Sequence, residues 1–338
     1  MANYSFYRNS ALVLLVITSI ISISVGPLAI GFGSALKALL HSLTAMDAFA
    51  IAPHEQVVID SIRLPRTLLA MTVGAMLAQA GAVMQGLFRN PLADPGIIGV
   101  STGAALGAAI CIVLLPVAPT ILLGMAAFAG GLGTTLLVYQ LAASRDGTSV
   151  VMLLLAGVAV SALFGAGIGV LTYLASDSAL RDLSLWQMGS IAGASFDYVW
   201  LTFAVLVILS WQFQRHANAL NALLLGEAEA RHLGIDVERL KYRMILLCAL
   251  GVGVSVAATG IIGFIGLVVP HIVRMLLGPD HRQLLPMSAV LGAILLALAD
   301  IGSRVLMAPA EVPVGLITAL IGAPFFIYLL LKQRHRLV

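Results

Sequence analysis

Ten apolar stretches, each near the length that crosses a bilayer, divide most of this chain into segments. A helix needs about 20 apolar residues to span the hydrocarbon core of a membrane. Because backbone groups in lipid must be hydrogen-bonded within the protein, we expect every stretch to be a helix. The pattern predicts an all-α polytopic membrane protein, organised as a single transmembrane domain over residues 1–338. The ten expected spans cover residues 11–31, 64–84, 96–115, 120–142, 149–174, 197–214, 241–259, 262–277, 285–307 and 314–331.

The composition agrees with this fold class. Hydrophobic residues make up 60% of the chain and charged residues only 10%, whereas a soluble domain carries about 25% charged residues. The net charge of +3 comes from sparse charges at span ends, so the lipid bilayer is an expected partner and nucleic acid is not. Cys111 and Cys248 lie inside apolar stretches, so we interpret them as small core residues, not as a disulfide or metal pair. The first stretch is interpreted as an uncleaved helix rather than a signal peptide.

The distribution of basic residues predicts the orientation in the membrane. If the N-terminus is cytoplasmic, 13 of the 18 basic residues fall on the cytoplasmic side. Cytoplasmic loops carry an excess of Lys and Arg, so we expect both termini in the cytoplasm. The five basic residues left outside are Lys37, Arg63, Arg66, Arg181 and Arg304.

The longest polar segment, Arg215–Arg243, lies between the sixth and seventh expected spans. It holds nine of the 33 formal charges in 29 of the 338 residues. Gly226 and Gly234 bracket a short expected helix in which Glu227 and Arg231 are four residues apart and can pair. Its acidic first turn and basic last turn suit the helix dipole. Two interpretations remain open at this point, a solvated linker or a contact surface for a partner.

Charge within the spans is nearly absent. Asp300 is the exception, and Arg304, four residues on, is its expected partner. His271 is interpreted as a hydrogen-bonded structural residue rather than a metal ligand. A proton-driven transporter needs carboxylates or histidines at mid-membrane depth, so a secondary transporter is the weaker alternative. No GxxxxGK[ST] motif occurs, so an uphill transporter of this kind needs a partner to supply energy.

A series of motifs lies in order along the chain from Ile62 onward. The motifs are IRLPRTLLA at Ile62–Ala70, GAVMQGLFRNPLADPGIIGVSTGA at Gly81–Ala104, LLAGVAV at Leu154–Val160, LRDLSLWQMGS at Leu180–Ser190, ALLLGEAEARHLGI at Ala222–Ile235, GFIGLVVPHIVR at Gly263–Arg274, GPDHRQLLP at Gly278–Pro286, ADIGSR at Ala299–Arg304 and EVPVGLITALIGAPFFIYLLL at Glu311–Leu331. Together they resemble the permease family of ABC importers for ferric siderophores, haem and cobalamin.

The resemblance implies a multi-pass permease of the bacterial inner membrane, not an enzyme. It implies a dimer of ten-helix subunits, with a second copy or a close relative. Two separate ATP-binding subunits would use ATP and Mg, and a periplasmic binding protein would deliver the solute. This chain itself would bind no cofactor and no metal, and it would carry no catalytic residue.

The resemblance also implies roles for individual residues. Short coupling helices within residues 215–240 would contact the ATP-binding subunit, and the segment Leu180–Gly193 would gate the outer mouth. The matching positions are, for ATPase coupling, Ala222, Gly226, Glu227, Ala230, Leu233 and Gly234; for docking of the binding protein, Arg63, Arg66 and Arg304; for the cytoplasmic gate, Asn90, Leu92, Thr148 and Ser149; and for the pathway lining, Gly165, Gly167 and Gly169. For the arginines, interfacial anchoring is the alternative.

The cargo is the least constrained expectation. The motif LRDLSLWQMGS is most similar to the haem-importing branch, so we favour haem over a ferric siderophore, with cobalamin third. No haem ligand supports this choice, and His54 is interpreted as a surface residue. The segment Leu28–Asp60 departs from the family pattern, so no role is carried over to it.

Overall fold

A computed structural model describes residues 4–26, 28, 30–44, 49, 51–115, 117–144 and 147–334 of the chain. Among these residues, seven helices are long and apolar enough to span a membrane, and three shorter apolar helices accompany them. Ten apolar helices were expected from the sequence, and the all-α fold is confirmed. The three shorter ones are Val100–Leu114, Ile265–Leu277 and Val314–Leu329.

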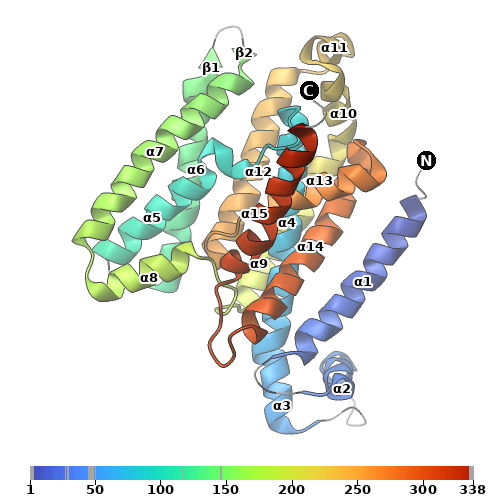
Figure 1. Cartoon of the computed structure of the whole chain (residues 1–338). Coiled ribbons are helices and arrows are strands. Elements are labelled where there is room, and N and C mark those ends of the chain that lie inside the picture. Colours follow the sequence, from blue (N-terminus) through green and yellow to red (C-terminus); the bar gives the residue numbers. More distant parts are fainter. Residues whose placement is uncertain are drawn as a thin grey trace.

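The elements follow one another along the chain with short connections (Figure 1). They are α1 (Tyr4–Ser24), α2 (Phe32–Thr44), α3 (Pro53–Val58), the π-helical η2 (Ile59–Arg63), α4 (Leu64–Leu87), the 3-10 helix η3 (Pro95–Ile98), α5 (Val100–Leu114), α6 (Thr120–Ala142), β1 (Ala143–Ser144), β2 (Gly147–Thr148), α7 (Val150–Leu174), α8 (Asp177–Gln187), α9 (Phe196–Arg215), α10 (Ala217–Leu225), α11 (Glu227–His232), α12 (Val237–Thr259), α13 (Ile265–Leu277), α14 (His281–Val305) and α15 (Val314–Arg334).

The bounds of several helices differ from the expected spans, and three of them show a local reason. The helix α1 lies earlier than the expected 11–31, because the polar residues before the apolar stretch continue the same helix. The helix α5 begins at Val100, after Gly99 has adopted a left-handed φ of 82°. The helix α13 begins at Ile265, after Phe264 with a φ of 67°. The segment left without a role, Leu28–Asp60, contains the helices α2 and α3.

The helix α4 is the centre of the bundle. Buried residues make up 89% of its most apolar stretch, whereas they make up 17% of that of α7. A side chain at Gly74 would collide with the carbonyl of Gly292 on α14, and one at Gly81 would collide with the backbone of Gly266 on α13. Small residues at these crossings let the three backbones approach closely, as is usual between membrane helices.

Polar side chains of α4 satisfy backbone groups of its neighbours. Pro270 lies inside α13 and has no N–H to donate to the carbonyl of Gly266. The side-chain amide of Gln85 donates to that carbonyl at 3.4 Å and to the carbonyl of Leu267 at 3.2 Å. The orphan carbonyl therefore finds a partner inside the bundle, as the apolar surroundings require.

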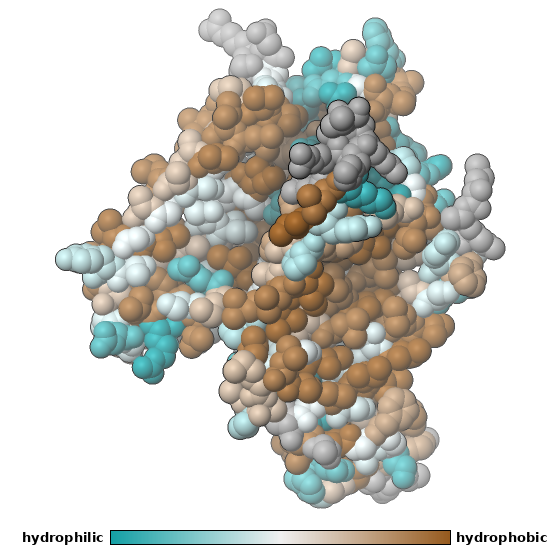
Figure 2. Space-filling model, in the orientation of Figure 1, coloured by the Kyte–Doolittle hydropathy of each residue, from teal (hydrophilic) through white to brown (hydrophobic). Residues whose placement is uncertain are grey.

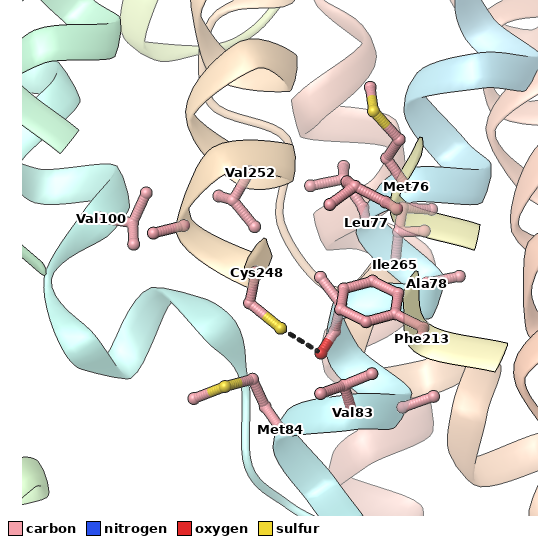
Figure 3. Close-up of a cluster of buried hydrophobic side chains, with 14 of the residues drawn as sticks. Met76, Leu77, Ala78, Val83, Met84, Val100, Phe213, Cys248, Val252 and Ile265 are labelled. Carbon is pink, nitrogen blue, oxygen red and sulfur yellow. Dashed lines mark hydrogen bonds between the residues drawn. The ribbon is translucent and has the colours of Figure 1, made fainter. Parts of the chain in front are cut away.

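The core around α4 is apolar (Figure 3). Met76, Phe213 and Val252 are buried there, from α4, α9 and α12. The thiol of Cys248 points to α4 and donates to the carbonyl of Ala80 at 3.6 Å. Both cysteines are free and buried, which confirms their interpretation as core residues.

Hydrophilic side chains gather at the two ends of the molecule and around α8 (Figure 2). One end carries α10, α11 and the β1–β2 hairpin, and we call it the α11 end; the other carries α2 and α3, and we call it the α3 end (Figure 1). Figure 2 shows hydrophobic side chains over the long sides between these ends. The first residues of α1 and the last residues of α15 both lie toward the α11 end. A chain that starts and finishes on the same side of a membrane crosses it an even number of times, as the ten expected spans require. The prediction that this end is cytoplasmic rests on the basic residues.

Candidate functional site

The short helix α11 is built as the sequence predicts. Gly226 separates it from α10 with a φ of 132°, and Gly234 follows it with a φ of 82°. The φ of Gly226 is one that residues with a side chain rarely adopt, so the conformation there requires glycine. The expected pair forms, because Arg231 lies 3.6 Å from Glu227.

The six predicted coupling residues divide between two faces. Ala222, Gly226 and Ala230 are buried against the rest of the chain, and Glu227 is half-buried. Leu233 and Gly234 are exposed, and Leu233 shows 64% of its surface. Leu225, at the end of α10, is exposed by 69%. A single exposed leucine is common on a protein surface. Here Leu225 and Leu233 lie on the two sides of the short helix α11 in the sequence, within the most charged segment of the chain.

A buried lysine, Lys241, contacts α11. The sequence alone marks this residue only as one of the basic residues near the end of a span. Lys241 on α12 is 2% exposed, and its Nζ lies 2.8 Å from Glu227 and 3.3 Å from Glu238. It also donates to the carbonyl of Thr148 at 2.9 Å. No local pattern in the sequence signals this contact, because Thr148 and Lys241 are 93 residues apart.

The four predicted gate residues lie in two loops. Asn90 follows α4, and its side chain accepts from the N–H of Leu92 at 2.9 Å, which closes a tight turn. Leu92 lines a narrow crevice together with His271 and Phe325. Nearby, Asp94 accepts from the N–H of Gly96 at 2.7 Å, and burial raises the pKa of its carboxyl while that hydrogen bond opposes the rise.

The second gate loop is the β1–β2 hairpin. Ala143 pairs with Thr148 in this short antiparallel ladder. Thr148 is buried, and its hydroxyl lies 3.2 Å from the hydroxyl of Tyr139. Ser149 is exposed and directly precedes α7. Both gate loops follow helices that run toward the α11 end, namely α4 and α6 (Figure 1).

The three glycines predicted to line the pathway do not share one face of α7. A side chain at Gly165 or Gly169 would meet nothing within 4 Å, whereas one at Gly167 would meet Leu106 of α5 at 3.4 Å. Gly165 and Gly169 therefore lie on the open side of α7, and Gly167 faces its neighbour. The open side is apolar and includes the exposed side chains Val151, Leu155, Val158, Leu163 and Val170.

The three arginines predicted to dock a binding protein are buried at the α3 end. Arg63, Arg66 and Arg304 are each less than 5% exposed. Arg63 donates to the carbonyls of Ile23 at 2.8 Å and Ser24 at 2.7 Å, so it joins the end of α1 to the start of α4.

Asp300 joins the other two arginines. Its carboxylate lies 2.8 Å from Arg66 and 3.1 Å from Arg304, and it is fully buried. The expected pair of Asp300 and Arg304 is confirmed. Arg66 also contacts Glu311 at 2.9 Å, and this carboxylate is 35% exposed. The partner of Glu311 was missed, because it lies 245 residues away in the sequence.

This burial changes what the docking prediction requires. Each guanidinium group is occupied by partners within the chain, and Glu311 holds the position on Arg66 that an incoming carboxylate would take. A docking role therefore requires an exchange of partners and stays a prediction. The alternative from the sequence, interfacial anchoring, agrees with the contacts made here.

No group of three or more His, Cys, Asp or Glu side chains that could hold a metal ion is found among the described residues. The fold and the site instead define a class. A bundle of ten apolar helices among the described residues, with a short separately bounded helix at one polar end, is an architecture that fits a multi-span membrane permease.

The sequence model of the FecCD transport family matches residues 14–332, so the chain belongs to this family, whose members are permease subunits of ABC transporters. The chain is similar to the hemin transport system permease protein HmuU of Yersinia pestis, with 47% identity over 82% of this chain and 84% of that protein. It is also similar to the vitamin B12 import system permease protein BtuC of Escherichia coli O9:H4, with 45% identity over 89% of this chain and 93% of that protein.

The cobalamin import system permease protein BtuC of Halobacterium salinarum is 44% identical over 85% of this chain and 77% of that protein. Among solved structures, a chain assigned to the metal-chelate type ABC transporters, in an inward-facing conformation, superposes with a TM-score of 0.83 and 34% identity over 98% of this chain and 100% of that one. The resemblance described from the motifs is confirmed.

Proposed function

We propose that this chain is the permease subunit of an ATP-driven importer of the bacterial inner membrane and that its cargo is an iron complex, namely haem. The observation that carries the proposal is α11. It is a separately bounded helix with Leu225 and Leu233 exposed beside it, at the end of the molecule that we predict to be cytoplasmic from the excess of basic residues. An exposed apolar pair of this kind is expected where another protein docks.

The proposed partner at α11 is an ATP-binding subunit, one for each permease. It would use ATP and Mg, and α11 would receive the movement that follows ATP binding. Asn90 and Leu92 in one loop, and Thr148 and Ser149 in the other, would form the cytoplasmic gate. This chain would then need no nucleotide site of its own, in agreement with the missing GxxxxGK[ST] motif.

A second copy of the chain is the proposed partner for the open side of α7. This side is apolar and carries Gly165 and Gly169, which leave room between the two copies. The solute would pass along this side, delivered by a periplasmic binding protein at the α3 end. The exposed helix α8, which overlaps the segment Leu180–Gly193 predicted to gate the outer mouth, follows α7 at the end of that helix away from the β1–β2 hairpin (Figure 1).

Haem is favoured by the 47% identity to a hemin permease and by the motif at Leu180–Ser190. Cobalamin is the second candidate, because two cobalamin or vitamin B12 permeases are 44% and 45% identical. The motifs also fit a ferric siderophore. The test compares a strain that lacks the chain with the same strain after the chain is returned to it, with haem, a ferric siderophore or cobalamin supplied in turn. Growth on haem that is restored by the chain supports the proposal. Restored uptake of cobalamin alone contradicts it.

A further inference from the structure

The β1–β2 hairpin and α11 are far apart in the sequence, yet both are bonded to the same buried side chain of α12. We infer that Lys241 is a positioning residue that fastens the hairpin to α11, so that the two move as one unit. The inference rests on the proposed function, in which α11 meets the ATP-binding subunit and Thr148 belongs to the gate. Lys241 would then carry the movement of the one to the other.

The ammonium group of Lys241 contacts three oxygens. It donates hydrogen bonds to the carbonyl of Thr148 at 2.9 Å and to the carboxylate of Glu238 at 3.3 Å. It also forms an ion pair with the carboxylate of Glu227 at 2.8 Å. These oxygens belong to β2, α12 and α11, so one atom joins three elements. The side chain of Lys241 is only 2% exposed, so its charge is buried together with these contacts.

Glu238 adds a second bridge between α12 and the hairpin. Its carboxylate accepts from the N–H of Thr148 at 2.8 Å. The peptide groups on both sides of Thr148 are therefore held, the N–H by Glu238 and the carbonyl by Lys241. Gly147 lies so close that a side chain there would approach this carboxylate to 2.9 Å, and its φ of 114° also requires glycine. The hairpin is thus seated on α12 by its backbone.

Charges within the cluster balance. Glu227 and Glu238 are opposed by Lys241 and by Arg231, which lies 3.6 Å from each carboxylate. Moving α11 alone would separate Glu227 from a buried ammonium, and buried charges without partners are strongly disfavoured. Moving α11 together with the hairpin leaves every pair intact. The favoured movement is therefore a joint one.

The variant Lys241→Met removes the charge and keeps a side chain of similar length. The matched control is Lys332→Met, because Lys332 is exposed near the same end, on α15, and contacts the ring of Tyr328. Lys241→Arg restores the charge and the donors. A second variant, Lys241→Met with Glu227→Gln, removes two opposite charges together, so it keeps the cluster neutral while it still breaks the link to Thr148.

The first measurement is made on the purified chain and does not depend on transport. Spin labels at Ala143→Cys and His232→Cys report the distance between the hairpin and α11, and both positions are exposed. Cys111 and Cys248 are buried, so the labels attach to the introduced cysteines. We expect a narrow distance distribution in the parent and in Lys332→Met, and a broad one in Lys241→Met and in the neutral double variant. Equal widths in all four proteins overturn the inference.

The second measurement uses the complete transporter in vesicles, with its ATP-binding subunits and loaded binding protein. Coupling between two sites is typically worth about 5- to 150-fold. We expect transport per ATP hydrolysed to decrease by a factor within this range in Lys241→Met, with hydrolysis retained, and to recover in Lys241→Arg. An unchanged ratio in Lys241→Met overturns the inference. If the parent itself neither recruits an ATP-binding subunit nor transports, the proposed function has failed instead.

Discussion

Removal of the Asp300 carboxylate is expected to destabilise the chain. Asp300 is fully buried and lies 2.8 Å from Arg66 and 3.1 Å from Arg304, which are themselves buried. Breaking a buried ion pair costs about 3–5 kcal/mol, because a charge is left without its partner. In Asp300→Asn, Arg66 keeps Glu311 and Arg304 keeps backbone carbonyls. We therefore expect the lower figure, about 3 kcal/mol of unfolding free energy.

The assay can use the two native cysteines. Cys111 and Cys248 are buried, so a thiol-reactive fluorescent dye reports unfolding as they become accessible. At roughly 2–4 °C for each kcal/mol, the midpoint of thermal unfolding should fall by about 6–12 °C. Asp182→Asn is the control, because Asp182 is exposed on α8. A midpoint for Asp300→Asn that matches the control would refute the reasoning, since it would mean that the two arginines do not depend on Asp300.

Three further predictions concern other contacts. Gln85→Leu leaves the carbonyl of Gly266 without its donor and should lower stability by about 1–3 kcal/mol in the same thermal assay, and an unchanged midpoint would contradict the role given to Gln85. Asp280 is the N-cap residue of α14, and the hydrogen bond from Arg282 holds the pKa of its carboxyl below the usual range. The stability that this carboxylate contributes should therefore be complete above about pH 4 and be lost as the pH falls below that value. The variant Asp280→Asn should not show this acid dependence. Glu311→Gln weakens the internal partner of Arg66, so binding-protein affinity should rise in titrations if Arg66 docks by exchange, and an affinity that does not change would leave Arg66 with an anchoring role.

Much of the fold could be predicted from the sequence, because apolar length alone decides where a chain crosses a membrane. The spans at 120–142 and 149–174 correspond closely to α6 and α7. The short helix α11 could be predicted because Gly226 and Gly234 bound it locally. Short helices such as α2, with 13 residues, could not, because they fall below the length of a membrane span and no other pattern marks them.

The contacts within the site could be predicted only where they are local. The pairs of Glu227 with Arg231 and of Asp300 with Arg304 follow from a spacing of four residues. The burial of Arg66 and Lys241 depends on Glu311 and Thr148, which are brought near by the packing of distant helices. Sequence spacing carries no information about such pairs. A basic residue at a span end therefore looked exposed when its guanidinium or ammonium group was buried.

The central claim is that the chain moves its solute with energy that a separate ATP-binding subunit delivers through α11. The most direct test is uptake of haem into vesicles that contain the chain, its ATP-binding subunits and a haem-loaded binding protein. We predict uptake that requires ATP hydrolysis, that does not respond to a proton gradient, and that is lost when Gly226 and Glu227 are replaced by bulky or charge-reversed residues. Uptake by the chain alone, driven by a proton gradient without the ATP-binding subunit, would contradict the account.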